Sequence, residues 1–274
     1  MGTRIHPTAV VDPAAELDDG VCVGPHAVVG AGVTVGSGTE IGAGAQVQGP
    51  ATRIGRQNRI FSHACVGFEP QDLKFQGEDS RLEVGDRNTF REFVTVHRGT
   101  GFGGGVTTVG SDNLFMAYTH VAHDCHVGDR CILVNCATLG GHVRVDDDAT
   151  IGAFSAVHQF TRVGRHAYVG GYTVLTMDAL PYVKTVGQKP ACYGVNSIGL
   201  RRKGLPPEVR RRIGDAMKVL LASGLNTTQA LERLRAEHGG HEEIDYLIAF
   251  LEGSERGVVK AGPGKRGDRG GGGQ

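Results

Sequence analysis

The chain has 274 residues, and its 29 lysines and arginines balance its 29 aspartates and glutamates. Balanced charge gives no reason to expect a nucleic-acid partner, because such partners are bound through a basic surface. The sequence has neither an apolar N-terminal run typical of a signal peptide nor about 20 consecutive apolar residues, so we expect a cytoplasmic protein without a membrane span. The six cysteines favour free thiols over disulfides, which fits a reducing compartment.

An apolar residue returns every six positions through two thirds of the chain, from Ile5 to Leu175, with a one-residue slip at Arg53. An α-helix cannot use this period, because 3.6 residues per turn would carry each apolar side chain off the previous face. Three hexads that close one triangular coil can use it, since each aliphatic side chain then stacks on its copy in the next coil. The sequence therefore predicts a mainly β fold, a parallel β-helix of roughly eight to nine coils.

Two segments, 72–83 and 99–108, interrupt the hexads. Each is expected to leave the coil and to return near the same corner, as a loop inserted into a solenoid does. Inserted loops often carry binding residues, so both are candidates for a functional site.

Helical patterns follow the repeat, which ends after Leu175. Apolar residues spaced for one helix face occur over 208–223 and 242–252, and Asn226 with Gln229 forms a capping box that begins another helix. We therefore predict a β-helix domain over 1–190, a small α-helical domain over 191–260, and a disordered Gly-rich tail over 261–274.

Stacking gives the first functional geometry. Residues about 18 apart should lie one above another at about 4.8 Å, the spacing of strands in a sheet. His123 should then lie beneath Gly141, and Gly141 beneath Gln159, while Asp124 should lie beneath His142. His158 falls on a neighbouring row. A single histidine on a solenoid surface is usually inert, but five polar side chains aligned by stacking favour a function.

A histidine beside a carboxylate suits general base catalysis, because neutral imidazole is available near pH 7. Gly141 directly above His123 would let a backbone N–H approach a developing oxyanion. These parts fit acyl transfer to a hydroxyl or an amine, with no covalent enzyme intermediate and no cofactor. A zinc site at His120, His123 and His126 is not expected, because hexads place His120 and His126 on different faces.

Five segments carry a family resemblance. They are PQDLKFQGE at 70–78, RNTFREFVTVHRGT at 87–100, AHDCHVGDRCILVNCATLGGHV at 122–143, AVHQF at 156–160 and GVNSIGLRRKG at 194–204. In order and spacing they resemble the UDP-N-acetylglucosamine acyltransferases that begin lipid A assembly. The resemblance covers about 5–260 and implies a left-handed β-helix, a homotrimer, and transfer of a 3-hydroxyacyl group from acyl carrier protein to the sugar 3-hydroxyl.

The resemblance also implies residue roles. His123 matches the catalytic base, Asp124 its orienting carboxylate, and Gly141 the residue whose N–H faces the thioester oxygen; Gly171 matches the position that limits acyl length. The substrate-binding positions are Gln71, Asp72, Lys74, His120, His142, His158, Gln159, Asn196, Arg202 and Lys203, the last three reached from a neighbouring subunit. The chain departs from the family pattern at two positions: Ile198 stands where some members carry glutamate, and Lys203 replaces an arginine.

Other functions remain open from sequence. The acceptor could be the 3-amino analogue of the sugar, or the chain could be a hexapeptide acetyltransferase that uses coenzyme A. A β-helix can also serve as a non-enzymatic scaffold, in which case His123 would be dispensable.

Overall fold

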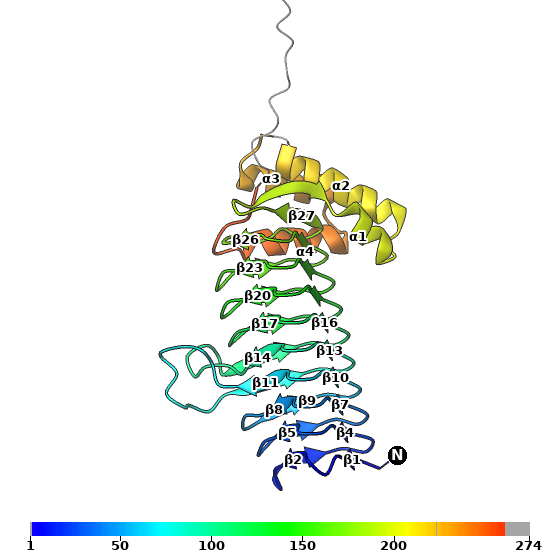
Figure 1. The fold of residues 1–274 in the computed structure, drawn as a ribbon. Helices are drawn as coiled ribbons and strands as arrows, with labels where there is room; N and C mark the ends of the chain where they lie inside the picture. Colours follow the sequence, from blue (N-terminus) through cyan, green and yellow to red (C-terminus); the bar gives the residue numbers. More distant parts are fainter. Residues whose placement is uncertain (1, 223, 261–274) are drawn as a thin grey trace, which may run out of the picture.

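The computed structural model describes residues 2–222 and 224–260. The tail predicted over 261–274 lies outside the described residues. The chain winds as a triangular shaft of short parallel strands with helices at its C-terminal end (Figure 1). The parallel β-helix predicted from the six-residue period is confirmed.

Three sheets form the faces of the shaft. Sheet A contains β1 (Arg4–Ile5), β4 (Cys22–Val23), β7 (Glu40–Ile41), β10 (Arg59–Ile60), β13 (Thr89–Phe90), β16 (Leu114–Phe115), β19 (Ile132–Leu133), β22 (Thr150–Ile151), β25 (Tyr168–Val169), β27 (Val183–Val186) and β28 (Ala191–Val195). Sheet B contains β2 (Val10–Val11), β5 (Val28–Val29), β8 (Gln46–Val47), β11 (Cys65–Phe68), β14 (Thr95–His97), β17 (His120–Val121), β20 (Thr138–Leu139), β23 (Ala156–Val157) and β26 (Val174–Leu175). Sheet C contains β3 (Glu16–Leu17), β6 (Thr34–Val35), β9 (Thr52–Ile54), β12 (Arg81–Val84), β15 (Val106–Val109), β18 (His126–Val127), β21 (Arg144–Val145) and β24 (Arg162–Val163).

The aliphatic residue of each hexad points into the shaft. Val121 pairs in register with Leu139, and Leu139 with Val157, and all three side chains are almost completely buried. Small residues such as Cys125 and Cys131 fill the corners of the core, and burial raises the pKa of both thiols to about 12. All six cysteines are free, as predicted.

Most corners of the shaft turn through a residue in the left-handed conformation. At the corner between sheets B and C, called here the B–C corner, these residues are Asp124, His142 and Phe160, with φ of 57°, 62° and 62°. Residues other than glycine seldom adopt this conformation. Hydrogen bonds between coils help to hold it: the His142 N–H donates to the His123 carbonyl at 3.0 Å.

Both predicted loop insertions are present, but they end at other residues than the sequence suggested. Residues 69–80 join β11 to β12 and residues 98–105 join β14 to β15, so the strands resume earlier than the 84 and 109 expected from sequence. The reason is that the two loops follow one another on adjacent coils. Arg81–Val84 therefore pairs along its whole length with Val106–Val109, which lengthens both strands.

Over 191–222 and 224–260 the C-terminal region contains four helices: α1 (Ser197–Arg202), α2 (Pro207–Ala222), α3 (Thr227–His238) and α4 (Glu242–Glu252). The last three match the predicted helices, and the Asn226 capping box is present. The short α1 and the antiparallel pair β27–β28 were not predicted, and β28 extends sheet A beyond residue 190.

Helix α4 lies across the upper coils of the shaft, below α2 and α3 (Figure 1). Arg162 lies over the Phe250 ring at 4.1 Å, and Arg165 over the Tyr246 ring at 4.5 Å. These contacts fix the helices to sheet C. Among the described residues, no helix is both long and apolar enough to cross a membrane.

Candidate active site

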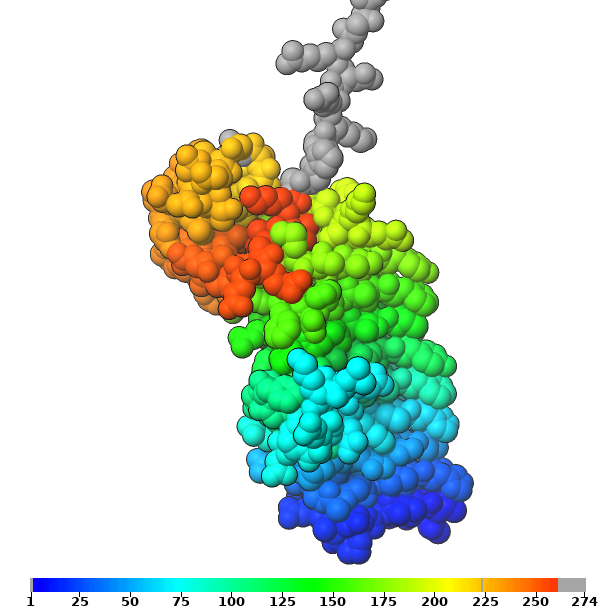
Figure 2. Space-filling model, turned by 90° about the vertical axis from the view of Figure 1, so that its left-hand side faces the viewer, coloured from blue at the N-terminus to red at the C-terminus, as the bar shows by residue number. Residues whose placement is uncertain are grey.

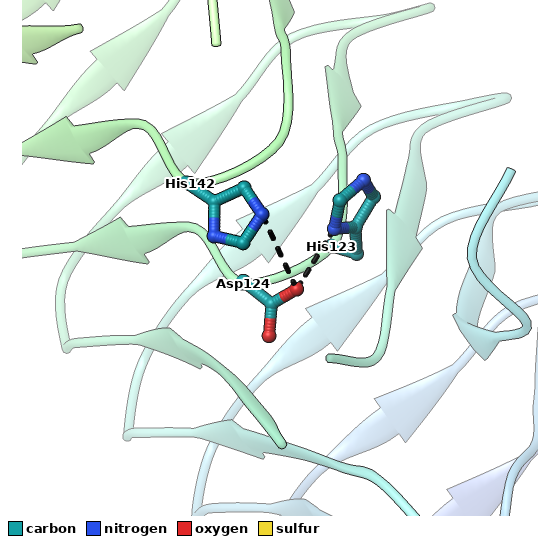
Figure 3. A group of neighbouring side chains, drawn as sticks. All are labelled: His123, Asp124 and His142. Atoms are coloured by element: carbon teal, nitrogen blue, oxygen red, sulfur yellow. Dashed lines mark hydrogen bonds and ion pairs between the residues drawn. The ribbon is translucent and has the colours of Figure 1, made fainter. Parts of the chain in front are cut away.

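His123 and Asp124 form a hydrogen-bonded pair at the B–C corner, just after β17 (Figure 3). The His123 Nδ1 lies 2.8 Å from Asp124 Oδ2. An ionised carboxylate only accepts, so Nδ1 carries the proton and Nε2 of the neutral ring is free to take one. The His123 side chain is 13% exposed and that of Asp124 is fully buried, so the pair is shielded but reachable from the imidazole side.

Thr100 holds the Asp124 carboxylate from the other side. Its N–H donates to Oδ1 at 3.0 Å, and its hydroxyl donates to Oδ2 at 2.6 Å. Burial acts to raise the pKa of Asp124, but the hydrogen bonds from His123 and Thr100 outweigh it, and the pKa lies below its usual range. Asp124 is therefore ionised at neutral pH and stabilises a positive charge on His123.

The loop 98–105 lies directly on Asp124. A Cβ added to Gly103 would lie 2.1 Å from Asp124 Oδ2, and one added to Gly99 would lie 2.8 Å from Oδ1. Only glycine fits this approach. Sequence reasoning missed Thr100 and Gly103 as parts of the site, although the glycine density of 99–105 within an insertion was a usable signal.

The structure confirms the predicted position of Gly141 directly above His123. A Cβ on Gly141 would lie 2.5 Å from His123 Cε1 and 2.6 Å from Nε2, which places the Gly141 backbone beside the free nitrogen. The Gly141 N–H donates no hydrogen bond to any other described residue, so it is available to an oxyanion. His142 stacks on Phe160 with ring centroids 4.4 Å apart, and burial lowers the pKa of His142.

Further predicted site residues surround His123. Asp72, on the loop 69–80 with Gln71 and Lys74, places Oδ2 3.9 Å from His123 Nε2. His120 Nδ1 is 2.7 Å from the Thr95 hydroxyl, and burial lowers the pKa of this histidine. Figure 2 shows the loop 69–80, in cyan, standing on the side of the shaft below the helices. The loop thus borders the site.

His158 and Gln159 follow β23, one coil above Gly141 and two coils above His123. The ring of His158 bonds through Nδ1 with the Gln159 carbonyl at 3.0 Å, and both side chains are exposed. A Cβ on Gly140 would lie 2.9 Å from the Gln159 backbone nitrogen, so the two coils touch closely here. These residues form the upper rim of the site.

The structure does not bring Asn196, Arg202 and Lys203 to His123. They line a separate cavity of about 480 Å³ with Asp148 and His166, at the corner between sheets C and A, called here the C–A corner. Lys203 Nζ lies 2.8 Å from Asp148 Oδ1. Gly171 lies after β25 at the third corner, between sheets A and B. Within one chain, the proposed base and the proposed nucleotide contacts occupy different edges.

One group of described residues offers metal-ligand atoms close together: His123, Asp124 and His142, within 4.8 Å of one another (Figure 3). Asp124 Oδ2 already accepts hydrogen bonds from Thr100 and His123. A cation bound there would have to displace the His123 N–H. The hydrogen bonding therefore favours proton transfer over metal binding at this group.

Comparisons with known proteins identify the family. The bacterial transferase hexapeptide model (six repeats) matches residues 106–141, and domain 2 of UDP N-acetylglucosamine O-acyltransferase matches 178–259. Relatives from Anaeromyxobacter dehalogenans (strain 2CP-1) and Myxococcus xanthus (strain DK1622) are 48% and 49% identical. The alignments cover 93% and 94% of this chain and 99% of each relative, and both are named acyl-[acyl-carrier-protein]–UDP-N-acetylglucosamine O-acyltransferase. The chain belongs to this family.

Solved structures of the same family have the same fold as this chain. The UDP-N-acetylglucosamine acyltransferase of Francisella novicida matches with a TM-score of 0.90 and 35% identity, over 93% of this chain and 94% of that one. The enzyme of Bacteroides fragilis matches with a TM-score of 0.90 and 40% identity, over 93% of this chain and 99% of that one. The resemblance drawn from the motifs is confirmed, as are the left-handed β-helix and the prediction of an acyltransferase.

Proposed function

We propose that this acyltransferase moves a 3-hydroxyacyl group from acyl carrier protein to the 3-hydroxyl of UDP-N-acetylglucosamine, the first step of lipid A biosynthesis. The names of the relatives support the donor and the acceptor. The observation that carries the chemistry is the His123 imidazole, held by ionised Asp124 on one side with the Gly141 N–H close to its free nitrogen.

The reaction needs one base and one oxyanion donor. His123 Nε2 takes the proton of the sugar hydroxyl while the hydroxyl oxygen bonds to the thioester carbonyl carbon. The Gly141 N–H stabilises the oxyanion. When the carbonyl re-forms, the C–S bond breaks, and the carrier thiolate takes the proton from the His123 imidazolium. No covalent enzyme intermediate is required, and Asp124 stays ionised throughout, as in other triads.

The loop 69–80 and the rim residues hold the substrates in this proposal. Asp72 faces His123 at 3.9 Å, so it is placed to accept a hydrogen bond from the sugar, with Gln71 and Lys74 beside it on the loop. His120, His142, His158 and Gln159 line the walls. A lysine such as Lys74 suits the diphosphate, because its ammonium is a compact charge that does not need bidentate geometry.

A homotrimer completes the site. Asn196, Arg202 and Lys203 lie at the C–A corner, so they serve as nucleotide contacts only if they meet the B–C corner of a neighbouring subunit. Gly171, at the corner between sheets A and B, likewise limits acyl length only if that corner faces the B–C corner of a neighbouring subunit.

We also propose the division into a β-helix over 1–190 and a helical domain over 191–260, and a cytoplasmic location.

Product analysis tests the reaction. Purified protein would be incubated with UDP-N-acetylglucosamine or its 3-amino analogue, and with 3-hydroxyacyl carrier proteins of several chain lengths or with acetyl- and succinyl-coenzyme A. We expect mass analysis to show O-acylated sugar nucleotide with a carrier-protein donor. Transfer only from coenzyme A, only to the amino sugar, or from no donor would each contradict the proposal.

Mixing of two impaired variants tests the shared site. His123→Ala removes the base, and the double variant Asn196→Ala/Lys203→Ala removes the nucleotide contacts. If the site spans two subunits, co-refolded mixed trimers contain sites with both parts intact, and activity returns. Mixed trimers no more active than the separate variants would place the whole site within one chain.

A further inference from the structure

We infer that Arg98 is a positioning residue that fixes the loop 69–80, and with it Asp72, against His123. The inference rests on the proposed function, because it gives Asp72 a role in binding the sugar. Arg98 lies within the segment 87–100 that carries the family resemblance, but the sequence gives it no role, since it stands beside an insertion and outside the row of His123, Gly141 and Gln159.

The Arg98 side chain reaches both ends and the middle of this loop. Its Nε donates to the Ser80 hydroxyl at 3.1 Å, where the loop ends. Its two terminal nitrogens lie 3.5 Å from the Gly67 carbonyl and 3.5 Å from Glu69 Oε1, where the loop begins. The guanidinium also lies 5.3 Å from the centroid of the Phe75 ring, in the middle of the loop.

Burial makes these contacts specific to arginine. The Arg98 side chain is 8% exposed, while its partner Glu69 is 72% exposed and is the only described acid that pairs with it. A buried charge is costly unless hydrogen bonds satisfy it, so the guanidinium binds the loop in the one arrangement that supplies them. The planar fork makes several bonds at fixed angles, which a lysine ammonium cannot reproduce.

The second loop has a separate attachment to the site. Thr100 bonds Asp124 through its own backbone and hydroxyl, which attaches the loop 98–105 to the site. The Gly101 N–H donates to Glu78 Oε1 at 3.0 Å, which joins this loop to the loop 69–80 six positions after Asp72. Neither contact uses the Arg98 side chain. Loss of that side chain should therefore release Asp72 while the Asp124–Thr100 bonds remain, so binding of the sugar should suffer more than the chemical step.

Kinetics of Arg98→Gln and Arg98→Lys test this inference. We expect Arg98→Gln to raise KM for the sugar nucleotide by about tenfold, which is about 1.4 kcal/mol, and to change kcat by less than about threefold. Arg98→Lys, which keeps the charge without the fork, should recover only part of the loss. A wild-type KM in both variants, or an equal fall in kcat, would overturn the inference.

A double-mutant cycle with Asp72→Asn separates positioning from general damage. If Arg98 acts through Asp72, the Arg98→Gln change should add little to KM once Asp72 is already replaced. Fully additive effects would contradict a route through Asp72.

Limited proteolysis reports on the loop without substrate, so it remains informative even if the proposed function fails. Trypsin should cut after Lys74 faster in Arg98→Gln than in the wild type, at temperatures well below unfolding. Arg81→Gln is the matched control, because the Arg81 side chain is half exposed and, among the described residues, bonds only Glu83, at 2.9 Å. Unchanged cleavage after Lys74 in both Arg98 variants, or equal acceleration in the Arg81 control, would overturn the inference.

Discussion

Two corners of the β-helix each place an aspartate beneath a histidine, but other side chains bind the two aspartates. Asp124 at the B–C corner and Asp148 at the C–A corner are both left-handed, with φ of 57° and 60°. Each has a histidine one coil above: His142 Nε2 and His166 Nε2 lie 3.9 Å from Oδ2 of the aspartate below. The repeat alone thus builds an aspartate–histidine contact twice.

The surroundings give the two aspartates different chemistry. Asp148 lies 3.0 Å from Arg130 and 2.8 Å from Lys203, so cations already balance its charge. Asp124 is held by Thr100 and His123, and none of the described lysines or arginines forms an ion pair with it. An unbalanced carboxylate can stabilise a proton arriving on imidazole, whereas a balanced one mainly holds structure. The difference between Asp124 and Asp148 therefore depends on their partners, and Thr100 from the inserted loop 98–105 is one of the partners of Asp124.

Removal of His123 should have the largest effect. His123→Ala deletes the proposed base, and we expect turnover to fall by at least about 10²-fold, the usual contribution of a positioned general base. His6→Ala, an exposed histidine of the first coil, is the matched control. Steady-state rates and thermal unfolding of both variants check this. Near wild-type turnover in folded His123→Ala would mean that His123 is not the base.

Replacement of Asp124 tests whether its carboxylate charge, which no described lysine or arginine balances, supports His123. Asp124→Asn keeps the shape but removes the charge, so His123 loses both its fixed tautomer and its electrostatic support. We expect turnover to fall by about 10- to 100-fold, with the protein still folded. The pH–rate profile checks the cause, since loss of the carboxylate charge beside His123 should change the profile. A profile identical to the wild type would deny Asp124 its orienting role.

Sequence predicted the fold and the alignment of His123 with Gly141 and Gln159, because both follow from a periodicity. Once hexads stack, His123, Gly141 and Gln159 must align, and the structure places them so. Loop ends were less predictable: strands β12 and β15 are longer than the hexads suggest because the loops before them stack on each other.

Contacts between segments far apart in sequence could not be predicted. Thr100 binds Asp124 across 24 positions, and Arg98 binds Gly67 across 31. No periodicity links these residues, since an insertion has no register of its own. The nucleotide residues were assigned through the family resemblance, which also implied that they act from a neighbouring subunit; the structure adds that they line a cavity at the C–A corner.

A methyl group on Gly141 should have an intermediate effect. Gly141→Ala brings Cβ within 2.6 Å of His123 Nε2, which pushes the imidazole away, and we expect turnover to fall by about tenfold. Its φ lies outside the left-handed region, so the backbone accepts alanine without strain. Gly214→Ala in α2, where a Cβ meets nothing within 4 Å, should keep activity and raise helix stability. Equal kcat in the two variants would contradict the close approach.

Asp148→Asn should have the smallest effect on chemistry and a measurable one on stability. Burial acts to raise the pKa of Asp148, but hydrogen bonds from Arg130 and Lys203 outweigh it, and the pKa is lowered. A lowered pKa means that the ionised group stabilises the fold above the ordinary aspartate pKa of about 3.9, and that this contribution is lost as pH falls through the folded-state value. We expect Asp148→Asn to reduce the free energy of unfolding at pH 7 by about 1–2 kcal/mol, a modest value because both cations are partly exposed.

Urea unfolding at pH 7, 5 and 3 measures this contribution. The difference between wild type and Asp148→Asn should persist at pH 5 and shrink at pH 3, because acid protonates Asp148 in the wild type and removes its charge as the substitution does. A difference independent of pH would mean that packing, not charge, makes Asp148 structural. The contrast between the two corners would then rest on Asp124 alone.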